Sequence, residues 1–276
     1  MTFKYIRIVS DLHLEAYRGR NIETLAIDFL SKDSRDEESV LVLAGDISSA
    51  PDQLLSFISE VEDRFLKVIF IPGNHCYYHH DYDAWNQTMD DRFTEYLSNT
   101  EWSNGGVGYL EIDSVRFIFS TMWGDGGRTL QEQAQVGYGL NDFRIIKKSG
   151  IRFTVNDMQK IHKGQKAEID RLLKVPYEGK SVVITHHMPS YRLCHPRFGN
   201  EINGGFAANC EDILAYDHAP DLWVGGHSHD SADTILWKTR YVANPLGYPQ
   251  EFDEFREKSK FNSFKDGPKF ISISEI

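Results

Sequence analysis

The sequence predicts an α/β fold in which helices cover a central sheet, and two observations support this. First, five short polar clusters each follow directly on an apolar run. An apolar run that ends in a polar cluster is typical of a buried strand whose carboxyl end opens into a functional loop. Second, segments with helical spacing of apolar residues lie between these runs. Alternating strands and helices are typical of a layered α/β domain with helices outside.

The five apolar runs are expected to be the central strands, at residues 6–9, 40–44, 68–71, 182–184 and 222–224. If they lie side by side in one sheet, all five polar clusters reach the same edge. Residues 107–110, 115–119, 234–237 and 240–242 are expected to be further strands, the last two forming a hairpin around Lys238 and Thr239.

Three helices are expected between the strands. Pro51 is typical of a first helical turn, and apolar residues recur at helical spacing from Leu54 to Phe65. A second helix is expected from Val155 to Leu173, before the strand at 182–184. Asn209 favours a short capped helix ahead of Leu222.

A single domain spanning residues 1–276 is expected. The polar clusters run from residue 11 to residue 229, so a boundary in the middle of the chain would separate them. No proline-rich or low-complexity linker marks such a boundary.

The cysteines and the hydropathy predict a cytoplasmic protein without a membrane segment. Three irregularly spaced cysteines do not form a disulfide framework and are expected to be reduced thiols. Lys4 and Arg7 interrupt the only early apolar run, which argues against a signal peptide. No segment approaches the roughly 20 apolar residues that span a bilayer. The oligomeric state stays open.

The polar clusters contain carboxylates, imidazoles and one amide, which are ligands for Mn, Fe or Zn rather than a thiolate set. Two neighbouring cations need a bridging ligand, and Asp46 is the candidate because Gly45 lets the chain turn sharply before it. Asp11 and His13 stand two residues apart, so in extended chain both point the same way, and a second pair repeats that spacing. The predicted dinuclear metal site comprises Asp11, His13, Asp46, Asn74, His186, His227 and His229.

These motifs resemble those of the calcineurin-like metallophosphoesterase superfamily: Asp-x-His, Gly-Asp, Gly-Asn-His, His and Gly-His-x-His occur in the same order. The resemblance implies a layered α/β/β/α sandwich of two mixed sheets flanked by helices. It also implies that Asp46 is shared between two metals. One metal takes Asp11, His13, Asp46 and His229, and the other takes Asp46, Asn74, His186 and His227.

A closer resemblance is to uncharacterised bacterial and phage members, whose segment Ser-Asp-Leu-His-Leu-Glu matches residues 10–15. Further matches lie at residues 122–125, 141–143, 185–190 and 244–248. The Gly-Asp motif is not followed by Arg-Gly, which makes a protein phosphatase a poor match. Many relatives have an acidic residue after Gly-Asn-His, whereas this chain has Cys76.

The expected chemistry is hydrolysis by a hydroxide that bridges two divalent cations and attacks phosphorus in line. His75 follows the ligand Asn74 and is the expected catalytic residue, donating a hydrogen bond or proton to the ester oxygen. An orienting role for His75 is the alternative.

The charge favours a small or short phosphate ester as substrate. The formal net charge of −11 argues against binding of long nucleic acid, and two divalent cations would bring it to −11 + 4 = −7. His187, His195 and Arg197 are candidate substrate-binding residues, with core or surface roles as alternatives.

No cluster of basic residues that would bind a terminal phosphate dianion is evident. The favoured substrate is therefore a phosphodiester, either a small one or a nucleotide-like one. The alternative enzymatic hypotheses are a phosphomonoesterase and a single-strand nuclease. A metal-binding scaffold protein without turnover is the non-enzymatic alternative.

Overall fold

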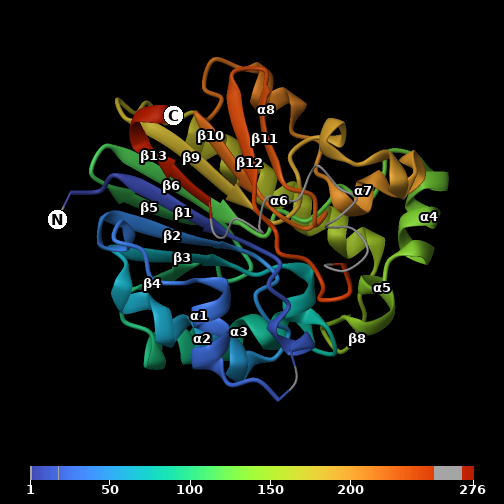
Figure 1. The fold of residues 1–276 in the computed structure, drawn as a ribbon. Coiled ribbons are helices and arrows are strands. Elements are labelled where there is room, and N and C mark those ends of the chain that lie inside the picture. Colours follow the sequence, from blue (N-terminus) through green and yellow to red (C-terminus); the bar gives the residue numbers. More distant parts are fainter. Residues whose placement is uncertain (1, 18, 252–268) are drawn as a thin grey trace.

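Two mixed sheets pack face to face, with helices on both outer faces (Figure 1). The computed structural model describes residues 2–17, 19–251 and 269–276. The first sheet has the order β13-β1-β2-β3-β4, with β13 antiparallel to β1 and the others parallel. Its strands are β1 (Tyr5–Val9), β2 (Ser39–Ala44), β3 (Lys67–Ile71), β4 (Thr100–Trp102) and β13 (Lys269–Ser272).

The second sheet has the order β11-β12-β10-β9-β6-β5, with parallel pairs in the middle and an antiparallel strand at each edge. Its strands are β5 (Gly108–Ile112), β6 (Val115–Ser120), β9 (Lys180–Thr185), β10 (Leu222–Gly225), β11 (Ala232–Leu236) and β12 (Thr239–Ala243). A small pair, β7 (Lys147–Lys148) and β8 (Ile151–Arg152), stands apart. The predicted sandwich is therefore confirmed.

The central strands are apolar throughout because both of their faces are buried. In β2, Val40 and Val42 belong to the core between the two sheets, together with Val182 and Ile184 of β9. The intervening Leu41 belongs to a second core beneath the outer helices. The chain thus needs a continuous apolar run rather than an alternating one.

Helices α1 (Ile22–Phe29), α2 (Pro51–Val61) and α3 (Tyr82–Tyr96) cover the first sheet. Helices α6 (Val155–Leu173) and α8 (Glu211–Ala215) cover the second. Three shorter elements, α4 (Leu130–Gly139), α5 (Asp142–Ile145) and α7 (Asn203–Phe206), gather beyond one end of the sheets (Figure 1). No helix among the described residues is long and apolar enough to cross a membrane.

The predicted helices form, with two differences at their ends. α2 starts at Pro51 but stops at Val61, because a 3-10 turn follows before Phe65. α8 has Cys210 rather than Asn209 at its N-cap, so the expected asparagine cap is wrong. The hairpin turn lies at Trp237 and Lys238, one residue earlier than expected.

The expectation that all five ligand-bearing strands share one sheet is also wrong. β1, β2 and β3 lie in the first sheet, whereas β9 and β10 lie in the second. Their carboxyl ends still meet, because backbone and side-chain bonds tie the sheets together there. His186, after β9, bonds through Nδ1 to the Ala44 carbonyl of β2 at 3.0 Å, and the Thr121 hydroxyl, after β6, donates to the Pro72 carbonyl, after β3, at 2.8 Å.

Candidate metal centre

The seven predicted ligands gather at this end of the two sheets. Asp11, His13 and His229 each offer a ligand atom within 4.8 Å of the others. Asp46, His186 and His227 form a second such group. The Asn74 Oδ1 atom lies 3.2 Å from His186 Nε2 and so joins the second group.

Asp46 lies between the two groups. Its Oδ2 is 3.2 Å from His186 Nε2, and it also forms a potential ligand group with His13 and His75. Its Oδ1 accepts a hydrogen bond from the His75 amide at 2.9 Å. A carboxylate within reach of both His186 and His13 has the position that a bridging ligand needs.

The backbone at these ligands is left-handed, not extended as the sequence spacing led us to expect. The φ angles are 52° at Asp11, 45° at His13, 52° at Asp46, 71° at His227 and 57° at His229. Non-glycine residues rarely adopt such angles, and strained backbone clusters at functional sites. Each side chain is therefore aimed by a tight turn at the end of its strand.

Glycines make room for the ligands. A Cβ on Gly73 would lie 2.0 Å from Asp46 Oδ1, and one on Gly45 would lie 2.2 Å from His186 Nδ1. Gly45 also has a φ of 92°, which favours glycine for its backbone alone. The Gly-Asp and Gly-Asn-His motifs thus contain glycine because Asp46 and His186 occupy the space of a side chain.

Three of the imidazoles are oriented through Nδ1. His186 donates to the Ala44 carbonyl, His229 Nδ1 lies 2.8 Å from Glu251 Oε2, and His13 Nδ1 lies 3.3 Å from Glu15 Oε1. A proton on Nδ1 leaves Nε2 with a free electron pair. Because carboxylate and carbonyl partners hold the proton on Nδ1, Nε2 is the ring atom that can bind a metal.

This orientation places electron pairs against one another. His13 Nε2 and His229 Nε2 lie 3.1 Å apart, although both are acceptors once Nδ1 carries the proton. The buried His227 Nε2 has no hydrogen-bond partner among the described residues. A cation in each of the two ligand groups would satisfy these atoms, and the mixture of carboxylate, amide and imidazole fits Mn, Fe or Zn.

The electrostatics of Asp46 and His186 also fit a cation site. Burial alone would raise the pKa of Asp46, but His186 and His75 outweigh it and hold that pKa well below its usual range. Burial lowers the pKa of His186, yet the Asp46 carboxylate outweighs this and raises it to about 9. The ionised Asp46 carboxylate thus has a proton on His186 beside it, and a bound cation would take the place of that proton.

Asn74 is oriented by a residue that sequence reasoning missed. Its Nδ2 donates to Asp142 Oδ1 at 2.8 Å, which leaves Oδ1 pointing toward His186. The Tyr78 hydroxyl donates to the same Asp142 oxygen at 3.0 Å. Asp142 lies in the matched segment 141–143, so a signal for it was present in the sequence.

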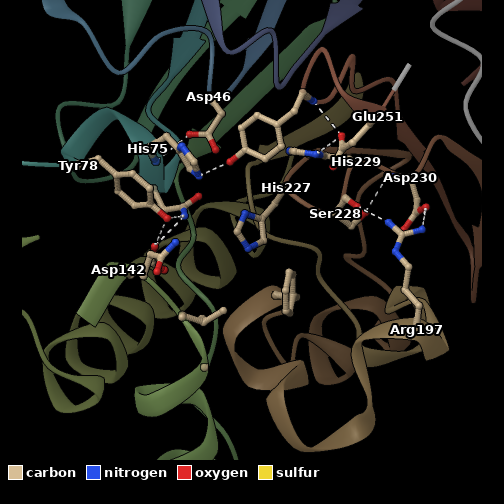
Figure 2. A pocket seen from close by; sticks show the side chains of 16 residues that line it. Asp46, His75, Tyr78, Asp142, Arg197, His227, Ser228, His229, Asp230 and Glu251 are labelled. Atoms are coloured by element: carbon tan, nitrogen blue, oxygen red, sulfur yellow. Dashed lines mark hydrogen bonds and ion pairs between the residues drawn. The ribbon is translucent and has the colours of Figure 1, made fainter. Parts of the chain in front are cut away.

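A cavity of about 300 Å³ opens over the ligands. Figure 2 shows Asp46, His75, His227 and His229 on one side of it, Tyr78 and Asp142 on another, and Arg197 with Asp230 opposite. Gly139, Leu140, Asn141, Phe206, Tyr248 and Glu251 complete the lining together with Asn74 and Ser228.

His75 lies at the edge of this cavity. Its ring stacks on Tyr78, with 3.9 Å between ring centroids, and its Nε2 lies 3.0 Å from the Tyr248 hydroxyl. Burial lowers the pKa of His75 to about 4. Tyr77, Tyr82 and Trp85, which follow in sequence, are core residues, so Tyr78 alone of these aromatics lines the cavity.

The three predicted substrate-binding residues are placed differently. Arg197 lines the cavity and pairs with Asp230 at 2.6 Å. His195 lines a neighbouring cavity with Cys194. His187 is fully buried, and its ring packs against His227 with 4.2 Å between centroids. Burial lowers its pKa well below the usual range.

Replacing Glu251 by alanine is expected to weaken metal binding by about 10- to 100-fold, because removal of an outer partner of a metal-binding histidine has this effect. His229 would lose the carboxylate 2.8 Å from its Nδ1. Calorimetric titration with Mn²⁺ measures the effect. Glu101→Ala is the control, since Glu101 pairs with Lys67 at the surface. Equal affinities of the Glu251 variant and the unaltered protein would show that Glu251 does not support the site.

Comparisons with known proteins agree with the fold and the motifs. No curated protein matches the sequence. The phosphopantetheinyl hydrolase PptH from Mycobacterium tuberculosis has 17% sequence identity and a TM-score of 0.70 over 93% of both chains. A candidate 5′-nucleotidase from Staphylococcus aureus has 14% identity and a TM-score of 0.46, over 87% of this chain and 48% of the other.

At 17% identity, the PptH structure establishes the fold alone. The sequence itself matches the family model described as calcineurin-like phosphoesterase over residues 5–231, which include all seven predicted ligands and His75. The chain therefore belongs to the calcineurin-like phosphoesterase family.

Proposed function

We propose that this chain is a single-domain phosphodiesterase that uses two divalent cations, Mn, Fe or Zn. One cation is held by Asp11, His13, Asp46 and His229, and the other by Asp46, Asn74, His186 and His227. The convergence of these side chains, with His13 and His229 Nε2 atoms 3.1 Å apart, is the observation that supports a metal centre.

When bound, the two cations supply a deprotonated water as the nucleophile at neutral pH and neutralise the phosphoryl oxygens. The protein's own part is to hold the ester beside His75. As the bond between phosphorus and the leaving oxygen breaks, that oxygen takes the electron pair, and the protonated form of His75 donates its Nε2 proton to it. With a pKa of about 4, this form is the minor one at neutral pH but a strong acid. The products are a phosphomonoester and an alcohol.

The charges around the cavity favour a diester over a monoester. Asp142, Asp230 and Glu251 line it, and Arg197 is the one lysine or arginine among the described lining residues. Arg197 is paired with Asp230 at 2.6 Å and donates to the Ser228 carbonyl at 3.0 Å. A monoester dianion carries one more negative charge than a diester. It would need the positive charge of Arg197, which is already paired with Asp230.

Rates on a set of substrates test the proposal. With Mn, Fe or Zn loaded, kcat/KM for bis-nitrophenyl phosphate is expected to exceed that for nitrophenyl phosphate and for a short single-stranded DNA. A phosphopantetheine diester belongs in the set because a protein of similar fold is a phosphopantetheinyl hydrolase. Preference for the monoester would identify a phosphomonoesterase, and preference for DNA a nuclease. Metal binding without turnover would indicate a scaffold protein.

Replacing Asp230 by asparagine is expected to shift selectivity toward monoesters by about tenfold. The change releases Arg197 from its carboxylate partner, and a charged hydrogen bond to the phosphate dianion is worth about 1.5–3 kcal/mol. The ratio of kcat/KM for nitrophenyl phosphate to that for bis-nitrophenyl phosphate measures the shift.

The control for Asp230→Asn is Asp217→Asn, which removes an exposed partner of Lys238 at 2.9 Å away from the cavity. It is expected to leave the ratio unchanged. An unchanged ratio in Asp230→Asn as well would show that the ion pair with Arg197 does not select between the two ester classes.

A further inference from the structure

Tyr248 contacts both the metal centre and His75. Its hydroxyl lies 3.0 Å from His75 Nε2, and its ring stacks on His13 with 4.2 Å between centroids. It comes from the segment after β12, more than 170 residues beyond His75 in the chain. Figure 2 shows His75 at the wall of the cavity that Tyr248 also lines.

The segment that carries Tyr248 is fixed to the end of β1. The Leu246 and Gly247 amides donate to the carbonyls of Ser10 and Asp11, each at 3.0 Å. The Tyr248 amide donates to Glu251 Oε2 at 2.8 Å, the same oxygen that contacts His229. The tyrosine is therefore held by the same backbone that positions the metal ligands.

We propose that Tyr248 is a positioning residue for His75: its hydroxyl holds Nε2 at the cavity wall until the leaving oxygen of the ester takes over that contact. This inference rests on the proposed phosphodiesterase function. Tyr248 lines the cavity together with His75, His227 and His229. Its segment lies outside residues 5–231, which the family model matches.

Stacking alone does not give His75 this orientation. Tyr78 stacks on the ring at 3.9 Å and so fixes its plane, but a half-turn about χ2 keeps that plane and exchanges Nε2 with Cε1. A directional bond to Nε2 prevents this rotation. The Tyr78 hydroxyl cannot supply the bond, because it donates to Asp142 at 3.0 Å.

The Tyr248 hydroxyl keeps its proton. Burial, followed by the nearby carboxylates of Asp46 and Glu15, raises its pKa above the usual value. The phenol can therefore donate to a neutral imidazole, or accept from it when Nε2 is protonated. The contact orients His75 before the ester binds, and it gives way to the leaving oxygen when Nε2 donates its proton.

Tyr248→Phe tests the inference because it keeps the ring stacked on His13 and removes only the hydroxyl. For a dinucleoside phosphate, whose leaving alkoxide needs a proton, kcat is expected to fall by about tenfold, the worth of one hydrogen bond of about 1–1.5 kcal/mol. For bis-nitrophenyl phosphate, whose leaving group needs little protonation, kcat is expected to change less than about twofold. KM is expected to stay the same for both.

Tyr78→Phe is the matched control. It removes a hydroxyl from the other tyrosine beside His75, but one that contacts Asp142 and so acts through Asn74. Its losses are expected to be equal for the two substrates. Equal losses in Tyr248→Phe, or a change confined to KM, would overturn the positioning role.

A second readout does not depend on turnover. In the Zn²⁺-loaded protein, the ¹⁵N chemical shift of His75 Nε2 is expected to move in Tyr248→Phe and to stay in Tyr78→Phe. If the unaltered protein hydrolyses neither diester, the proposed function fails, while the chemical shift still decides whether Tyr248 contacts His75. An unmoved shift in Tyr248→Phe would overturn the inference.

Discussion

Replacing Asp46 by asparagine is expected to lower kcat/KM for a phosphodiester by about a thousandfold or more, because two cations would lose their shared negative ligand. Asparagine has nearly the same shape, and its carbonyl oxygen can still accept from the His75 amide, which Asp46 Oδ1 accepts at 2.9 Å. The variant should therefore fold. Its metal content is expected to fall from two ions per chain to one or none.

Metal analysis and diester kinetics on the same preparation check this prediction. Asp217→Asn removes an equal charge from the surface, where Asp217 forms an ion pair with Lys238. This variant is expected to bind metal and hydrolyse the diester normally. An Asp46→Asn protein that retains two ions and most of its activity would show that Asp46 is not the bridge.

Replacing His75 by alanine is expected to lower kcat for alkyl diesters by about 100-fold or more and to affect nitrophenyl diesters far less. General acid catalysis contributes about 10²–10⁴-fold where the leaving group needs a proton, and nitrophenolate needs little. The imidazole lines the cavity, and its backbone amide bonds to Asp46, so the substitution keeps the backbone contact.

Kinetics on a dinucleoside phosphate and on bis-nitrophenyl phosphate measure the difference. His218→Ala is the control, because His218 pairs with Asp170 on α6, away from the cavity. Losses of equal size on both substrates would assign His75 an orienting role rather than proton donation.

The central strands could be predicted because burial on both faces leaves an unbroken apolar run, as in β2 and β9. Their division between two sheets could not be predicted from these runs. Which strands pair depends on backbone bonds that any apolar residue can make, so only the family resemblance indicated two sheets. α3 was missed although Tyr82, Trp85, Met89 and Phe93 are buried on one face at helical spacing.

The candidate ligands could be identified from the sequence because each lies in a short local motif. The residues that hydrogen-bond to them lie far away in the sequence. Glu251 contacts His229 across 22 residues, and Asp142 contacts Asn74 across 68. Tyr248 belongs to a matched segment whose role the sequence did not reveal. Carboxylates and tyrosines are common in loops, so only the fold shows which of them reach a ligand.

The conformation of the ligand loops could not be predicted either. A spacing of two residues places Asp11 and His13 on one side of an extended strand, whereas the structure turns both into left-handed backbone. Leu12 between them is fully buried, so the turn serves packing as well as the site. The predicted ligand residues do come together, although the extended backbone expected for them does not form.

Anomalous scattering from crystals of the Mn²⁺-loaded protein with phosphate tests the dinuclear centre most directly. The account predicts two peaks roughly 3.5 Å apart with Asp46 between them. It places one peak beside His13 and His229 and the other beside His186 and His227. A single peak, or two peaks that do not share Asp46, would contradict it.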